Sequence, residues 1–170
     1  MEVAGLPQAI VDFAAAGRVA KRAELKSIRL LAVSAKCDAK ISAPLEPNVG
    51  LGCEVACHDG SALEIVATCQ FTASTTQAQV AEATIKYLLI YEIQGGEPLD
   101  PGDLAEFATS NGTLNSWPFL REFLYGLTTD MGYAAYTLPT FHFVPKPPEK
   151  KEAGGKPAPT SKASKAEAKP

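Results

Sequence analysis

The sequence has no apolar run approaching the roughly 18 residues that a membrane-spanning helix needs. A basic cap is also missing at its start, where Glu2 stands, and Asp12 interrupts the apolar stretch that begins at Ala9. Neither a secretory signal nor a transit peptide is therefore expected. Four cysteines are too few for a disulfide scaffold in a chain of this size, which favours free thiols in a reducing compartment. These absences predict a cytoplasmic protein with no direct membrane insertion.

Basic residues are almost missing from the middle of the chain. Between Ile41 and Pro145, only Lys86 and Arg121 oppose twelve Asp and Glu residues. A body with this charge repels the phosphates of nucleic acids, so nucleic-acid binding is not expected.

The sequence also lacks a nucleophile elbow, a phosphate-binding loop and a dinucleotide fingerprint. The pattern nearest to a metal site is Cys53, Cys57 and His58. On a strand, Cys53 and Cys57 would share one face about 13 Å apart, and His58 would point to the other face. Zinc–sulfur bonds of about 2.3 Å cannot span that gap. No metal, cofactor or catalytic residue is therefore predicted, and the protein is not expected to be an enzyme.

What the chain does contain is the composition of an ordinary globular domain, 46% hydrophobic and 21% charged, in 170 residues. Runs rich in branched apolar residues predict four strands, at residues 26–37, 51–58, 63–73 and 81–94. The turn at Asp59-Gly60-Ser61 predicts a hairpin between the second and third. In the fourth, alternation places Ala83, Ile85, Tyr87, Leu89, Tyr91 and Ile93 on one face.

Helices are predicted only after these strands. The first begins at Asp100 and runs to about Ser110, with Gly112 as its C-terminal stop. The second begins near Ser116, takes Pro118 in its first turn and carries a broad apolar stripe. Gly126, inside this helix, suggests close approach of another backbone. Strands followed by helices predict an α+β fold, a four-stranded antiparallel sheet with helices packed on one face.

The two ends of the chain differ from this body. Residues 1–24 are predicted to form an N-terminal unit whose amphipathic helix covers residues 7 to about 24. The folded domain is expected at residues 25–144. Residues 145–170 are rich in Pro, Lys and Ala and cannot bury enough apolar area to order themselves, so a disordered tail is predicted.

The order of elements is distinctive in combination. Four strands are followed by Gly95-Gly96, by the helix start Trp117-Pro118-Phe119-Leu120-Arg121-Glu122, and by Leu138-Pro139 leading into Phe141 and Phe143. In this combination the chain resembles the SecB family of export chaperones over roughly residues 23–144. The separate N-terminal helix and the stretch from Arg22 to Leu31 look more like the SecB-like chaperones attached to toxin–antitoxin systems.

The resemblance implies a homotetramer, a dimer of dimers, that holds unfolded or precursor polypeptides without ATP and keeps them competent for Sec-dependent export. Apolar grooves would bind these clients, and the matching candidates here are Leu88, Ile90, Leu99, Phe107, Trp117, Phe119, Tyr133, Tyr136 and Phe141. Candidates for the contact between subunits are Phe123, Leu124, Gly126 and Leu127. Glu82 matches an acid that family members present to the SecA motor, but Ala32 and Lys36 replace the first-strand acids, which puts docking to SecA in doubt.

Three alternatives remain open at this point. The chain could be a chaperone dedicated to an antitoxin, or a scaffold that binds partners through its tail. It could also be a small-ligand pocket or hydrolase using Asp103 and Glu106, although carboxylates at a helix start are favoured by the helix dipole alone.

Overall fold

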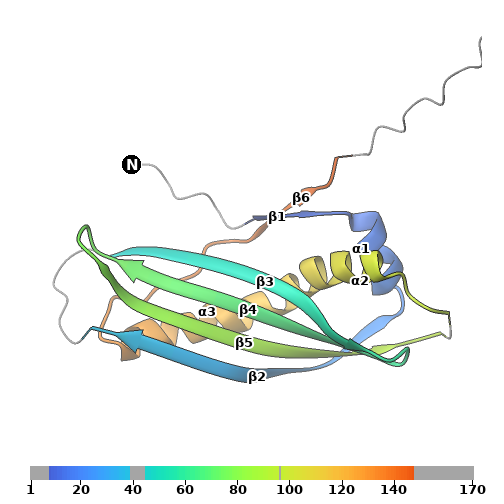
Figure 1. Cartoon of the computed structure of the whole chain (residues 1–170), viewed down its shortest axis with the longest axis horizontal. Helices are drawn as coiled ribbons and strands as arrows, with labels where there is room; N and C mark the ends of the chain where they lie inside the picture. Colours follow the sequence, from blue (N-terminus) through green and yellow to red (C-terminus); the bar gives the residue numbers. More distant parts are fainter. Residues whose placement is uncertain (1–7, 39–44, 96, 148–170) are drawn as a thin grey trace, which may run out of the picture.

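The computed structural model describes residues 8–38, 45–95 and 97–147, and its main feature is a four-stranded antiparallel sheet in the order β2-β5-β4-β3. Its strands are β2 (Ala23–Cys37), β3 (Glu46–His58), β4 (Ala62–Ser74) and β5 (Gln79–Ile93). All four predicted strands are present and the α+β class is confirmed. Figure 1 shows the long strands side by side, with α3 (Thr113–Asp130) behind them and α1 (Phe13–Ala20) and α2 (Pro101–Phe107) near one end of the sheet beyond β3.

The central strand β5 separates the two faces of the sheet as its alternation predicts. Alternate residues from Ala83 to Ile93 are buried, whereas the residues between them are half-buried or exposed. The buried face carries the helices, because the Tyr91 ring lies edge-on to Phe107 with centroids 5.1 Å apart. We call this the helix side and the opposite face the outer face.

The hairpin between β3 and β4 is also confirmed. Gly60 turns the chain with a φ of 92°, a value that favours glycine. The Asp59 carboxylate accepts hydrogen bonds from the backbone N–H groups of Ser61 and Ala62, at 2.9 and 2.7 Å. The turn is therefore held by its own side chain.

The helix layer is continuous where two separate helices were predicted. Helix α2 (Pro101–Phe107) passes through a π-helical turn, η1 (Ala108–Gly112), directly into α3 (Thr113–Asp130). The predicted stop at Gly112 is wrong, because its φ of −59° is helical. A Cβ there would lie 3.1 Å from both Cys53 Cβ and Ile65 Cγ2, so close packing on the sheet explains the glycine. Pro118 consequently lies well inside α3 and not in a first turn.

The predicted N-terminal helix is wrong at both ends. Residues Gln8–Val11 form strand β1, and α1 covers only Phe13–Ala20. Asp12 is the helix cap, since its carboxylate accepts the N–H groups of Ala14 and Ala15 at 3.0 and 3.1 Å. The residue that interrupts the apolar stretch therefore starts the helix.

Strand β1 pairs in parallel with β6 (His142–Pro145), in the register Gln8↔His142 to Val11↔Pro145. The Lys146 N–H continues the pairing by donating to Val11 O at 2.8 Å. The first residues of the predicted tail are thus part of this pair, and residues 148–170 lie outside the described residues. In the part of the chain that is described, no helix is long and apolar enough to cross a membrane.

Candidate functional site

The helix side of β2 is only partly covered, since Ala23 and Ile28 pack against the core but other apolar residues of the strand are exposed. Helix α3 packs against β3, β4 and β5. On β2, Leu25, Leu30 and Val33 face the same side through their register with buried residues of β5, yet they are 37–47% exposed. Phe119 on α3 is 42% exposed and its ring lies 6.0 Å from that of Tyr87, the partner of Leu30. We call Leu25, Leu30, Val33 and Phe119 the β2–α3 surface, an apolar area open to another polypeptide.

The four predicted contact residues of α3 do not share one environment. Phe123, Gly126 and Leu127 are half-buried, whereas Leu124 is fully buried and packs inside the chain. A Cβ at Gly126 would meet nothing within 4 Å. No contact within the described chain therefore requires this glycine.

The predicted client-binding residues are divided between the two faces of the sheet. Leu88 and Ile90 are half-buried on the outer face of β5. Phe107 is 1% exposed and belongs to the core, so its prediction as a surface residue needs correction: it lies in the last turn of α2, enclosed against Tyr91. Trp117 is also buried. Half-exposed or exposed positions on the helix side remain for the other five, Leu99, Phe119, Tyr133, Tyr136 and Phe141.

Four aromatic rings form a continuous row from the inside of the chain to its surface. Trp117 donates its indole N–H to Pro139 O at 3.1 Å and lies edge-on to Phe141, with centroids 5.0 Å apart. Phe141 contacts Phe143 at 5.1 Å, and Phe143 contacts Phe13 of α1 at 6.2 Å. We call these residues the aromatic row. The contact of Phe13 with Phe143 could not be predicted from the sequence, because nothing local links the two residues.

The N-terminal unit, β1 and α1, is held on α2 by ionic contacts. The Arg18 guanidinium donates from Nε and Nη2 to the two carboxylate oxygens of Asp103, at 2.6 and 2.5 Å. This hydrogen bonding lowers the pKa of Asp103, whereas its burial acts in the opposite direction. Glu106 accepts the backbone N–H of Asp12 at 3.0 Å. Asp103 and Glu106, considered above for a small-ligand pocket or hydrolase, therefore attach the N-terminal unit to the helix layer.

A second arginine holds the segment that leads from the sheet to the helices. Arg22 donates from Nε to Gln94 O at 2.7 Å and from Nη2 to Gly95 O and Glu97 O at 3.1 and 2.9 Å. The Gln94 N–H returns a bond to Arg22 O at 2.8 Å. The start of β2 and the crossover after β5 are therefore fixed to one another.

Acidic side chains on the outer face lie next to lysines. Glu82 is 3.3 Å from the Lys36 ammonium and accepts a hydrogen bond from the Gln79 amide at 3.2 Å. Lys26 lies between Glu24 and Glu92 at 2.8 and 2.7 Å, and its hydrogen bonds to them raise the pKa of the ammonium group. Glu82, the acid predicted to contact SecA, thus forms an ion pair with Lys36, the residue that stands where the family pattern has an acid.

The cysteines and histidine of the metal pattern point differently from what alternation predicts. A bulge between Val55 and Cys57 places Cys57 opposite Glu64 on the outer face, and His58 opposite Leu63 on the helix side. Among the described residues, no group of three or more His, Cys, Asp or Glu side chains is close enough to bind a metal ion. The extra residue at the bulge places Cys57 and His58 on the faces opposite to those that simple alternation predicts.

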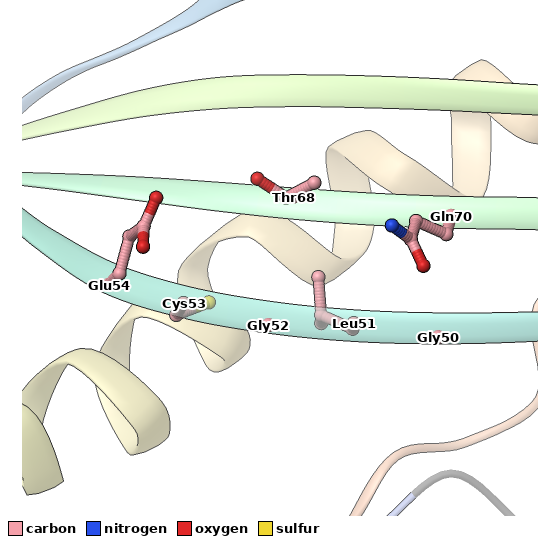
Figure 2. A pocket seen from close by; sticks show the side chains of 7 residues that line it. All are labelled: Gly50, Leu51, Gly52, Cys53, Glu54, Thr68 and Gln70. Carbon is pink, nitrogen blue, oxygen red and sulfur yellow. The ribbon is translucent and has the colours of Figure 1, made fainter.

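A hollow of about 460 Å³ lies along β3 and β4 (Figure 2). Gly50 and Gly52 leave space opposite Gln70 and Thr68 on β4, and Leu51, Cys53 and Glu54 complete the lining. The Cys53 thiol lies 3.5 Å from Thr113 Oγ1, and burial raises the pKa of the thiol. Because a reactive cysteine needs a lowered pKa, this hollow does not activate Cys53 as a nucleophile.

No family model and no curated protein matches this chain. Among solved structures, it is similar to the SecB-like chaperone of Mycobacterium tuberculosis, solved in complex with a ChAD peptide from the HigA1 antitoxin. The TM-score is 0.68 at 25% identity, over 75% of this chain and 96% of that one. A protein of unknown function from Streptococcus agalactiae gives a TM-score of 0.45 at 14% identity, over 69% of this chain and 97% of that one.

Proposed function

We propose that this chain, which is a SecB-like protein, is an ATP-independent holding chaperone whose dedicated client is an antitoxin of a toxin–antitoxin system. The observation that carries the proposal is the similarity to a SecB-like chaperone that was solved with an antitoxin peptide. The similarity covers 96% of that chaperone and 75% of this chain. The exposed apolar residues of the β2–α3 surface support it, because a holding chaperone must leave apolar surface uncovered.

The physical basis is the burial of apolar surface without chemistry. Each Å² of apolar area removed from water contributes about 25 cal/mol, so a few hundred Å² suffice to hold an extended chain. Binding the non-native chain in preference to the native one shifts its folding equilibrium by mass action, and no nucleotide is needed. Such a protein acts in the cytoplasm, where its clients are synthesised.

The export role is the second candidate. The SecB-like fold supports it, but the contacts of Glu82 do not favour docking to SecA. Its carboxylate lies 3.3 Å from the Lys36 ammonium, so the charge of the lysine offsets the negative charge that a motor would recognise at this position. The antitoxin role needs no motor, so the pairing of Glu82 with Lys36 on the outer face does not count against it.

We also propose a homotetramer, a dimer of dimers, that uses part of the exposed apolar area. Helix α3 offers Gly126, where a neighbouring backbone can approach, beside half-buried Phe123 and Leu127. Edge strand β2 offers the β2–α3 surface. Clients would then occupy the apolar positions that assembly leaves open.

Light scattering of an aggregating client tests the holding activity. A heat-denatured client is mixed with the purified protein at equal subunit concentration, and scattering is followed without nucleotide. We expect scattering to be suppressed, whereas an equal mass of serum albumin should act as an inert control. Unchanged aggregation at a tenfold excess of the protein would overturn the proposal.

The antitoxin role is tested with the antitoxin reading frame that we expect beside this gene. The antitoxin is expressed with and without the chaperone, and its half-life and soluble fraction are measured. We expect both the half-life and the soluble fraction of the antitoxin to rise when the chaperone is present. If they do not change, while a preprotein requires the chaperone for export, the second candidate is the correct function.

A further inference from the structure

The outer face of the sheet, opposite to α3, has two halves that differ in charge. Strands β3 and β4 carry Glu46, Glu54 and Glu64 and contain no lysine or arginine. Strands β2 and β5 carry four lysines and arginines together with three glutamates. Among the described residues, none of the three glutamates on β3 and β4 forms an ion pair. We call the outer side of β3 and β4 the acidic half.

The hollow along β3 and β4 lies in this acidic half. Gly50 and Gly52 occupy outer-face positions of β3, opposite Gln70 and Thr68, and Glu54 follows them on the same face (Figure 2). Glycine inside a strand weakens it and often marks a place where another backbone approaches closely. A Cβ at Gly50 or Gly52 would meet nothing within 4 Å, so no contact within the described chain requires either glycine. The hollow therefore leaves room for a segment that the described residues do not supply.

The lysine-rich end of the chain has the charge that the acidic half lacks. Residues 148–170 contain six lysines against three glutamates, and no Leu, Ile, Val, Met, Phe, Tyr or Trp. A segment of this composition is not expected to form a core of its own, so it is available to bind a folded surface. Opposite charges would attract it to β3 and β4 in preference to β2 and β5.

This segment also begins on the β3 side of the sheet. It follows β6, which Figure 1 shows beyond β3, whereas β2 is the opposite edge. The 23 residues from 148 to 170 span on the order of 75 Å when extended. The 13 residues of β3 span about 43 Å. Every position along β3 is therefore within reach of lysines in the segment.

We infer that residues 148–170 bind in the hollow of the acidic half, with lysines next to Glu54 and Glu64 and the backbone across Gly50 and Gly52. Exposed ion pairs are individually weak. A tethered segment, however, has an effective concentration on the order of 1 mM, so an equally weak dissociation constant gives half occupancy. The β2–α3 surface lies on the other face of the sheet, so this binding is independent of the proposed function.

Carbodiimide cross-linking of the full-length protein, followed by mass spectrometry, tests the inference because the reagent joins a lysine amine to a carboxylate in contact with it. We expect lysines of residues 148–170 to be joined to Glu54 and Glu64 at least about fivefold more often than to Glu122, an exposed glutamate of α3. In about 1 M salt the Debye length falls to about 3 Å, and this preference should largely disappear.

The double variant Gly50→Thr/Gly52→Thr fills the hollow without changing its charge. Threonine suits a strand, and a Cβ at either position has open space, so we expect the fold to be retained. Cross-links to Glu54 and Glu64 should fall to the level of those to Glu122. Ala32→Thr/Ser34→Thr, at alternate positions on the same face of β2, is the matched control and should leave the cross-links unchanged.

Equal cross-linking of Glu54, Glu64 and Glu122 in the unchanged protein would overturn the inference, as would cross-links that survive in Gly50→Thr/Gly52→Thr. A yield that rises with protein concentration would also overturn it, because the segment would then come from another molecule. So would cross-links to Glu54 that form only with a lysine-containing client. None of these outcomes changes the suppression of client aggregation, which light scattering measures separately.

Discussion

Arg18 and Asp103 are 85 positions apart in the sequence and form a two-point ion pair, with nitrogen–oxygen distances of 2.5 and 2.6 Å. Asp103 is 9% exposed, so its carboxylate depends on the guanidinium for much of its solvation. Such forked geometry is specific to arginine among the basic residues. The pair fixes α1 on α2, next to the strand β1 that leads into α1.

We expect Arg18→Ala and Asp103→Asn each to lower the midpoint of thermal unfolding, because each variant leaves the other residue charged but without its oppositely charged partner. The double variant should be little worse than the worse single variant, since both changes remove the same interaction. Calorimetry of all three variants measures this. Lys21→Ala, at the exposed end of the same helix, is the control and should leave the midpoint unchanged. Additive effects would show that the ion pair contributes nothing of its own.

The same pair predicts a dependence on acid. Hydrogen bonding to Arg18 lowers the pKa of Asp103 below its ordinary value of 3.8, so the stabilisation is present above that value and is lost as the pH falls below it. The unfolding midpoint of the unchanged protein should therefore fall more steeply between about pH 4 and pH 2 than that of Asp103→Asn. Parallel curves for the two proteins would contradict this.

Gly112→Ala should destabilise the chain by about 1–3 kcal/mol, because its Cβ would press on Cys53 and Ile65 at 3.1 Å. Gly17→Ala in α1 is the matched control. A Cβ there meets nothing within 4 Å, so we expect a gain of up to about 1 kcal/mol from helix propensity. Urea denaturation measures both. Equal changes in the free energy of unfolding of the two variants would mean that the sheet does not limit the size of the side chain at position 112.

Val33→Glu should lower the molecular mass in solution, because Val33 belongs to the β2–α3 surface and a charge there opposes assembly. The neighbouring Ser34 lies opposite Thr84 on the outer face of the same strand. Ser34→Glu should leave the mass unchanged. Analytical ultracentrifugation compares the two, and an identical mass for both variants would exclude this surface from the assembly.

The four thiols should differ in reactivity. Cys37 and Cys57 are exposed, whereas Cys69 is buried and burial raises its pKa to about 12. Labelling at pH 8 followed by mass spectrometry should modify Cys37 and Cys57 first, Cys53 slowly, and Cys69 only after denaturation. Early labelling of Cys69 would show that the core between the sheet and the helices opens.

Deletion of residues 148–170 should leave the suppression of client aggregation intact. The deletion retains Lys146, whose N–H donates to Val11 O. The proposed binding residues all precede the deleted segment. Light scattering with the shortened and full-length proteins measures this, and loss of activity on deletion would favour a scaffold that works through its tail.

The sheet could be predicted from the sequence because its patterns are local. Alternation along β5 identified the buried face, and Asp59-Gly60-Ser61 identified the hairpin. Errors arose where a residue type has two physical uses. Gly112 resembles a helix stop but serves close packing, and Asp12 resembles an interruption but caps a helix.

The candidate surfaces were less predictable than the fold, because exposure depends on contacts between distant segments. The core position of Phe107 results from its packing on Tyr91 of β5, and nothing near Phe107 in the sequence indicates this. The parallel pairing of β1 with β6 cannot be predicted from the sequence either, because each strand has only four residues and no turn connects them. Arg18 and Asp103 likewise share no local spacing.

Pairing of β1 with β6 also sets an order of events during synthesis. Gln8 and His142 are 134 positions apart, so the ribosome must release almost the entire chain before these strands can meet. Until then β1 has no strand to pair with, and the hydrogen-bonding groups that it offers to β6 stay without their partners. During its synthesis the chain would thus be, for a time, an incompletely folded polypeptide, which is the kind of molecule that it is proposed to bind.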